Sequence, residues 1–147
     1  MAAPASAVAT ILRYGDARLR LRRRDVQPAE DVRDLAERLW ASLDAARGLG
    51  LAAPQLGDLR RVIAARDPDK PRRPGLILVN PVLVATAGPV VSFEEGCLSF
   101  PGMYVHVRRP RGATVAYRDL AGEPRRLQDE GLIARIVLHE IDHLEGV

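Results

Sequence analysis

Apolar residues recur at helical spacing near the start of the chain, in residues 28–48, PAEDVRDLAERLWASLDAARG. Pro28, Glu30 and Asp31 suit a first helical turn, and Gly48 suits a C-terminal stop. The pattern predicts an amphipathic helix that turns one face to the core. The residues expected on that face are Val32, Leu35, Ala36, Leu39 and Leu43.

After this helix, short runs rich in β-branched residues alternate with Pro, Gly and Asp. The expected strands are residues 60–66, 75–80, 89–93, 104–109, 113–119 and 123–128. The segment DLAGE at 119–123 suits a hairpin connection, which favours antiparallel pairing. A second helical pattern begins near residues 128–129 and continues to the chain end. This order of elements predicts an α+β fold, with residues 1–147 in one domain.

Composition and charge narrow the class of protein. The chain has 147 residues, and 47% hydrophobic content is enough to bury a core. The formal net charge is +3, and arginines cluster in residues 18–24 and 66–73. No aromatic side chains interleave these arginines for stacking on bases, so we interpret them as solvated faces. Neither the opening MAAPASAVAT nor any later stretch predicts a signal peptide or a membrane span. We expect a cytoplasmic protein, with neither a membrane nor a specific nucleic acid as partner.

The second helix carries the first candidate chemistry, the segment HEIDH at 139–143. At about 100° per residue, His139 and His143 share one face. One-turn spacing lets two imidazoles converge on a divalent metal, and Glu140 can reach water beside that metal. The alternative is a pair of helical histidines that are satisfied by hydrogen bonds or solvent, because this motif is short enough to recur by chance.

Such a metal site needs a third protein ligand. Glu145 points elsewhere on the helix, so the ligand must lie upstream. The candidates are Cys97, His106 or an acid. His106 alternates with Val105 and Val107 and is expected to face outward from a strand. A lone buried thiol is the ordinary interpretation of Cys97, so the residues alone leave the ligand open.

The segment GLGLAAPQLG at 48–57 is the third notable stretch. Its first six residues fit the dinucleotide fingerprint GxGxxA. They follow a helix and run into Pro54, however, so the nucleotide-binding interpretation fails on context. What remains is exposed backbone with one amide side chain, Gln55.

Taken together, GLGLAAPQ at 48–55, EGCLS at 95–99 and HEIDH at 139–143 closely resemble the three signature motifs of the peptide deformylases. The resemblance covers nearly the whole chain. It extends to ILRYGDARLR at 11–20, similar to the family's opening strand, NPVL at 80–83, similar to its central strand, and EGLIAR at 130–135. The implied fold is α+β, with antiparallel β-sheets around a central helix that carries HExxH.

The resemblance implies that Cys97 is the third metal ligand, beside His139 and His143. It also implies Fe²⁺ as the metal, with Zn²⁺ or Ni²⁺ as substitutes, although the ligand set alone would suggest zinc. The implied enzyme is a metal-dependent hydrolase. It would remove the N-formyl group from the N-terminal formylmethionine of newly made polypeptides and release formate.

The same resemblance assigns roles around the metal. Glu140 would move the proton between water and the leaving amine. The side-chain amide of Gln55 and the backbone N–H of Leu98 would stabilise negative charge on the formyl oxygen. The peptide would pair as an added strand with the backbone of Gly48, Leu49 and Gly50.

Further residues would line or support the site. Leu132, Ile136 and Phe93 are the expected lining of the methionine pocket, and core packing is the alternative for Phe93. Glu95 and Arg109 match positions that form a supporting ion pair in the family, and solvated side chains are the alternative.

Two departures limit what carries over from the family. Leu138 stands where relatives commonly have Gln. Val147 is the last residue, whereas most bacterial relatives continue with a strand and a C-terminal helix that docks at the ribosome. We therefore expect a C-terminally short, monomeric enzyme acting on N-formylmethionyl peptides, and ribosome docking through that helix is not carried over.

Three other functions compete with this one. A metalloprotease would share HExxH but would not explain the other two motifs. A specialised deformylase would act on another formylated amine. A non-catalytic paralogue would serve as a binding module, although the intact Gln55 and Glu140 argue against it.

Overall fold

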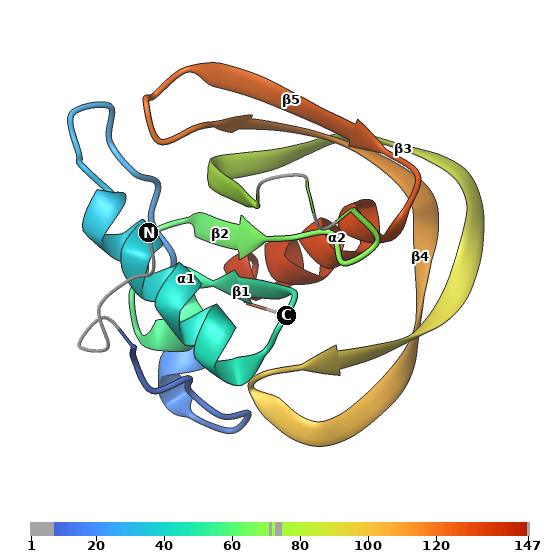
Figure 1. The fold of residues 1–147 in the computed structure, drawn as a ribbon, viewed down its shortest axis with the longest axis horizontal. Helices are drawn as coiled ribbons and strands as arrows, with labels where there is room; N and C mark the ends of the chain where they lie inside the picture. The colour runs from blue at the N-terminus through green and yellow to red at the C-terminus, as the bar shows by residue number, and fades with distance from the viewer. Residues whose placement is uncertain (1–7, 71, 73–74, 147) are drawn as a thin grey trace.

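Each strand pairs with the next one along the chain, which produces one antiparallel sheet in the order β1-β2-β3-β4-β5 (Figure 1). The computed structural model describes residues 8–70, 72 and 75–146. Most of MAAPASAVAT, residues 1–10, for which no signal peptide was expected, therefore lies outside the described residues. The strands are β1 (Gly50–Ala52), β2 (Val62–Ala65), β3 (Leu76–Cys97), β4 (Phe100–Arg118) and β5 (Pro124–Asp129). With the helices α1 (Arg33–Ala46) and α2 (Leu132–Leu144), they confirm the α+β class. One continuous sheet, rather than several, curves around α2.

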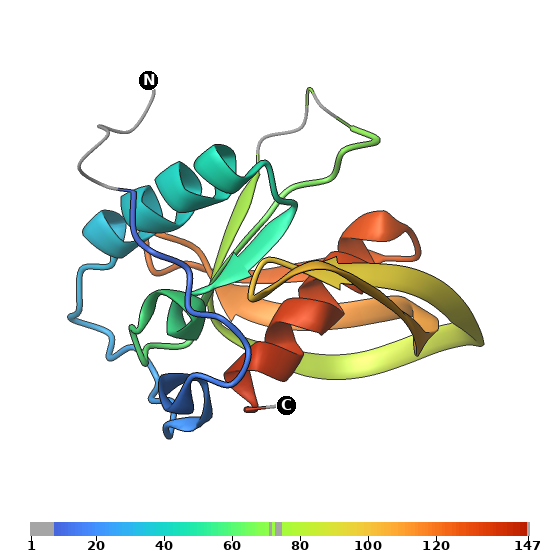
Figure 2. The same ribbon diagram turned by 90° about the horizontal axis from the view of Figure 1, so that it is seen from below.

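The two helices cover opposite faces of the strands β1 and β2 (Figure 2). Val62 and Ala64 of β2 pack in the cluster with α1, whereas Ile63 and Ala65 pack in the cluster with α2. Successive side chains of a strand point to opposite faces, and here both faces are buried. This double burial explains why β2 reads VIAA without a polar residue.

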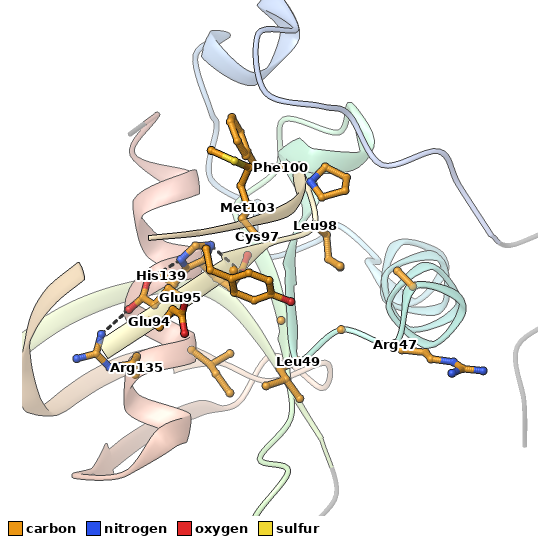
Figure 3. Close-up of a pocket in the computed structure, with 18 of the residues that line it drawn as sticks. Arg47, Leu49, Glu94, Glu95, Cys97, Leu98, Phe100, Met103, Arg135 and His139 are labelled. Carbon is orange, nitrogen blue, oxygen red and sulfur yellow. Dashed lines mark hydrogen bonds and ion pairs between the residues drawn. The ribbon is translucent and has the colours of Figure 1, made fainter. Parts of the chain in front are cut away.

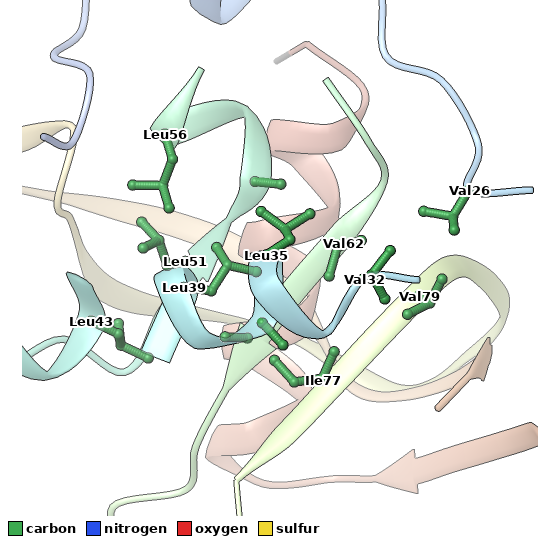
Figure 4. Close-up of a cluster of buried hydrophobic side chains, with 13 residues drawn as sticks. Val26, Val32, Leu35, Leu39, Leu43, Leu51, Leu56, Val62, Ile77 and Val79 are labelled. Atoms are coloured by element: carbon green, nitrogen blue, oxygen red, sulfur yellow. The ribbon is translucent and has the colours of Figure 1, made fainter. Parts of the chain in front are cut away.

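The apolar face predicted for the first helix is confirmed. Leu35, Leu39 and Leu43 are all at most 1% exposed and pack on Leu51 and Val62 of the sheet (Figure 4).

The predicted bounds of that helix were wrong at its start. Gln27 and Glu30 close a separate turn, in which the backbone N–H of Glu30 donates to the carbonyl of Gln27. The carboxylate of Asp31 then accepts from the backbone N–H of Arg33, where the helix begins. At the other end the helix stops as expected, but Arg47, one residue before Gly48, takes the left-handed capping conformation at φ 56°.

The prediction of short separate strands at 75–80, 89–93, 104–109 and 113–119 was wrong, because the structure has two long strands there, β3 and β4. Pro81 and the pair Gly88 and Pro89 were taken as strand ends. They lie instead at shifts of register between β3 and β4, after Val79 and after Ala87. A bulge leaves a residue unpaired and bends the strand without ending it, which is how proline is tolerated there. The segment NPVL lies within β3, the middle strand of the five, as expected.

The ends of the chain hold two further corrections. Residues 11–20 form no strand, because Gly15 adopts φ 95° and Asp16 caps a short 3-10 helix at Ala17–Arg20. The second helix begins at Leu132, not near 128–129, because Asp129 still pairs with Ala113 as the end of β5. The hairpin at 119–123 forms as predicted. No helix among the described residues is long and apolar enough to cross a membrane.

Truncating the fully buried Leu39 to Ala should lower the free energy of unfolding by about 2 to 5 kcal/mol, because the α1 core cannot close the cavity. Urea titration followed by circular dichroism measures this change. Glu37→Ala, on the exposed face of the same helix, is the control and should change the value by less than about 0.5 kcal/mol. Equal losses in both variants would contradict the assigned helix face.

Candidate metal centre and active site

Cys97, His139 and His143 each bring one ligand atom to a common point, and these atoms lie within 4.8 Å of one another. Cys97 is the last residue of β3, and both histidines lie one turn apart on α2. The Sγ of Cys97 lies 3.2 Å from Nε2 of His143. Nε2 of His139 is buried without a hydrogen-bond partner among the described residues. Because an unpartnered buried nitrogen is costly, and because one sulfur and two imidazoles suit zinc or iron, the residues fit a divalent transition metal.

Glu95 fixes the orientation of His139. Its Oε1 lies 2.9 Å from Nδ1 of His139, and Arg109 reaches both of its oxygens, at 2.7 and 3.0 Å. Burial by itself would raise the pKa of Glu95. The hydrogen bonds from His139 and Arg109 outweigh burial and hold that pKa near 2. With Nδ1 engaged by the carboxylate, Nε2 is the nitrogen left for a metal.

The two histidines sit in different electrostatic surroundings. Burial lowers the pKa of His139, but the Cys97 sulfur and the Glu95 carboxylate outweigh it and raise this pKa to about 10. Burial and the positive charge of His139 lower the pKa of His143 to about 4. The Cys97 sulfur and the Glu95 carboxylate thus favour positive charge at His139, whereas His143 stays neutral near pH 7.

Glu140 is a buried carboxyl group beside this cluster. Burial raises its pKa to about 7, and its Oε2 has no hydrogen-bond partner among the described residues. Its Oε1 lies 3.9 Å from Nε2 of His139. A carboxyl group with a pKa near neutrality can both accept and return a proton.

Gln55 is buried and held beside Cys97. Its side-chain oxygen accepts from the backbone N–H of Ala52 at 2.9 Å, and its amide nitrogen donates to Oγ of Ser99 at 2.9 Å. The same nitrogen lies 3.7 Å from Sγ of Cys97. An amide nitrogen carries two hydrogens, and here one is donated to Ser99 and the other to the Cys97 sulfur, which places this amide beside the metal ligands.

A cavity of about 690 Å³ opens next to the cluster (Figure 3). Cys97, His139 and Glu140 line it, together with Leu98. The residues expected to bind the peptide backbone and its first side chain also line it, namely Gly48, Leu49, Gly50, Phe93, Leu132 and Ile136. Gln55, which was expected to contact the formyl oxygen, is buried behind this lining.

The glycines leave room at this cavity. A Cβ atom at Gly50 would stand 2.8 Å from Ile136, and one at Gly48 would stand 2.7 Å from Leu98. Both distances are too short for real side chains, so the backbone there stays bare. Phe93 is 55% exposed, which excludes core packing as its role.

The other residues considered as metal ligands lie outside the Cys97, His139 and His143 cluster, and the predicted supporting residues lie beside it. His106 is exposed on β4, and Glu145 pairs with Arg61 at 2.9 Å. Glu95 and Arg109 form the expected ion pair, and Arg109 also binds Asp142 at 2.8 Å.

Sequence reasoning missed two residues of the site, Ser99 and Arg135. Ser99 lies within EGCLS, so the motif itself could have pointed to it. Arg135 donates to Glu95 at 2.6 Å, one helical turn before His139. An arginine on a helix ordinarily indicates a solvated face, and only its one-turn spacing from His139 could have drawn attention to it.

Comparisons with known proteins point to one family. The sequence model of the polypeptide deformylase family matches residues 8–147. A peptide deformylase of Synechococcus sp. (strain RCC307) is 49% identical over 119 residues, which are 80% of this chain and 59% of that protein. One of Thermomicrobium roseum is 49% identical over 147 residues, covering 96% of this chain and 83% of that protein. The chain thus spans only about three fifths of the Synechococcus relative.

Solved structures show the same likeness. The crystal structure of a peptide deformylase from Synechococcus elongatus in complex with actinonin has a TM-score of 0.87 and 38% identity, covering 93% of this chain and 76% of that one. A K1U-bound class I type b peptide deformylase from Acinetobacter baumannii has a TM-score of 0.88 and 33% identity, covering 95% of each chain.

Replacing Cys97 with Ala should weaken metal binding, because it removes the only sulfur of the cluster. Anaerobic dialysis against Co²⁺ measures the metal bound per chain, and the sulfur-to-cobalt charge-transfer absorption should disappear in the variant. His106→Ala removes the exposed histidine of β4 and should bind Co²⁺ like the unchanged protein. A charge-transfer band that survives Cys97→Ala would exclude this ligand set.

Proposed function

The chain belongs to the polypeptide deformylase family, and we propose that it hydrolyses the N-formyl group from peptides that begin with N-formylmethionine, releasing formate. One observation carries the proposal. Glu140 is buried beside a Cys/His/His cluster and lines a cavity walled by bare glycine backbone, and it has a pKa of about 7 and an oxygen without a partner in the described part of the chain. A proton-transfer group, a metal cluster and an extended binding wall are what hydrolysis of a peptidyl formamide requires.

Cys97, His139 and His143 would hold the metal, which we take to be Fe²⁺, with Zn²⁺ or Ni²⁺ as substitutes. The donor set accommodates any of these ions, so the choice of iron rests on the family resemblance. When bound, such an ion supplies Lewis-acid chemistry, acidifying water and polarising the formyl oxygen. Glu95, held by Arg109, keeps His139 in the ligating orientation.

Glu140 moves the proton in this scheme. It takes one from water as the water oxygen adds to the formyl carbon. It then returns that proton to the amine nitrogen as the carbon–nitrogen bond breaks, which yields formate and a free N-terminus. A pKa near 7 allows both transfers at neutral pH.

Gln55 and Leu98 act on the formyl oxygen. The amide hydrogen that Gln55 directs at the Cys97 sulfur would turn to the formyl oxygen, and with the backbone N–H of Leu98 it would donate to the charge that develops there as water adds. Ser99 and the backbone of Ala52 hold the Gln55 amide in place, so little reorganisation is needed during the reaction.

The cavity would bind the start of the peptide. The bare backbone at residues 48–50 pairs with the peptide main chain as an added strand, which is independent of side-chain identity. Leu132, Ile136 and Phe93 receive the first side chain. Residues 1–147 would act as one catalytic domain in the cytoplasm, where formylated nascent chains are made.

Glu140→Ala should lower formate release from formyl-Met-Ala-Ser by at least about 10²-fold, because it removes the carboxyl group that moves the proton. The assay uses anaerobic, Fe²⁺-loaded protein, and metal content should stay unchanged. Glu145→Ala, on the exposed end of the same helix, is the control and should keep full activity. Substantial turnover by Glu140→Ala would remove this residue from the role, and an inactive but metal-loaded unchanged protein would overturn the proposed function.

Gln55→Leu should lower kcat by about 10² to 10³-fold with a smaller change in KM, because the amide acts on charge that exists only in the transition state. Steady-state kinetics on the same peptide separates the two constants, and a thermal melt monitors the lost contact to Ala52. A change confined to KM would show that Gln55 only binds the substrate.

A further inference from the structure

The cavity has a charged wall as well as apolar ones. Arg135 lines it and is only 9% exposed (Figure 3). One terminal nitrogen, Nη1, donates to Glu95 at 2.6 Å and to the carbonyl of Val107 at 3.1 Å. The other, Nη2, donates to the carbonyl of Val91 at 2.8 Å, and the guanidinium lies 5.3 Å from the ring centre of Phe93. These contacts fix the group rigidly against the two strands β3 and β4.

Two of the N–H groups of the Arg135 guanidinium make no hydrogen bond to the described residues. The guanidinium carries five N–H groups, and the three contacts above use three of them. The Nε–H and one hydrogen of Nη2 have no acceptor among the described residues. The nearby carboxylate of Glu95 is already engaged by Arg109 and His139. A ligand in the cavity with a hydrogen-bond acceptor at the right depth would satisfy this donor capacity.

The spacing of residues along α2 indicates how deep in the cavity the first side chain of the substrate would reach. Leu132, Arg135, Ile136 and His139 all line the cavity and recur at the spacing of one helical face. Arg135 precedes His139 by four residues, about 6 Å along α2. In the proposed function, the formyl group of the substrate lies beside His139 and Glu140. The first side chain, which in methionine is about as long as one helical turn, then ends at the level of Arg135.

We propose that this protein also deformylates peptides whose first residue is oxidised methionine, N-formylmethionine sulfoxide, with Arg135 donating to the sulfoxide oxygen. The inference rests on the proposed function, since the site and the hydrolysis are the same. Only the formyl carbon–nitrogen bond is broken, with water as the co-reactant, and the sulfoxide leaves unreduced on the product.

An apolar pocket would exclude this substrate. Leu132, Ile136 and Phe93 offer no donor, and a sulfoxide oxygen buried among them would lose its hydrogen bonds to water without replacement. Arg135 supplies that replacement from a group already desolvated and fixed, so little ordering is needed on binding.

The first test compares kcat/KM of the unchanged, metal-loaded protein on formyl-Met-Ala-Ser and on its chemically prepared sulfoxide. A value for the sulfoxide within about tenfold of that for methionine supports the inference, and a larger gap overturns it. Mass spectrometry of the product should show the sulfoxide intact. Formate from the methionine peptide alone overturns only this inference, whereas formate from neither peptide overturns the proposed function and this inference with it.

The second test assigns the effect to Arg135. Arg135→Leu should lower the ratio of the sulfoxide value to the methionine value at least about tenfold. Arg109→Leu is the matched control, because Arg109 also donates to Glu95 but does not line this cavity. It should lower both values together and leave the ratio unchanged. A ratio that is unchanged in Arg135→Leu, or that falls equally in both variants, overturns the role of Arg135.

A conservative variant keeps this test decisive if the leucine variant does not fold. Arg135→Lys retains a positive charge for Glu95, but one ammonium group cannot reproduce the forked contacts to Glu95 and to the sulfoxide. The ratio should fall in this variant as well. An unchanged ratio in folded Arg135→Lys would overturn the hydrogen bond proposed here.

Discussion

The buried carboxylate of Glu95 is the interaction on which the site depends. It lies near the end of β3 and is paired with Arg109 of β4 and with Arg135 and His139 of α2. A charge taken out of water is tolerated only when its partners are complete, and losing one partner of a buried ion pair costs about 3 to 5 kcal/mol. The same contacts therefore set the separation between the sheet and the helix. Cys97, two residues beyond Glu95, is held opposite His143 as a consequence.

The curvature of the sheet allows Cys97 of β3 to lie beside the two histidines of α2. β3 begins between the two helices, in the main core, and ends at the metal cluster. Bulges around Pro81 and at residues 88–89 bend it, so that it passes around α2 and returns as β4. A straight pair of strands this long would leave the helix uncovered and carry Cys97 away from the histidines.

Glu95 and Glu140 lie in different surroundings, which suit them to different chemical roles. Glu95 accepts hydrogen bonds from three side chains and has a pKa near 2, so it stays charged. Glu140 is more deeply buried, has a pKa near 7, and has one oxygen without a partner among the residues that the structure describes. The first is suited to orientation and the second to proton transfer. Arg135, held by Glu95 at the cavity wall, extends the same network from the metal cluster to the substrate pocket.

The sequence by itself determined the features that repeat over a few residues. These include the core face of α1, the shared face of His139 and His143, and the hairpin at 119–123, because helical and strand periodicity is local. Three spaced motifs also identified the family. The residues alone left the third ligand open, and the family resemblance named Cys97, which the structure brings to the histidines in place of His106. Only the tertiary structure decided that β3 runs on through its prolines and that Arg135 is buried at the cavity. Those outcomes depend on the register and curvature accumulated along β3 and β4 and on their contacts with the distant helix α2, which no local pattern encodes.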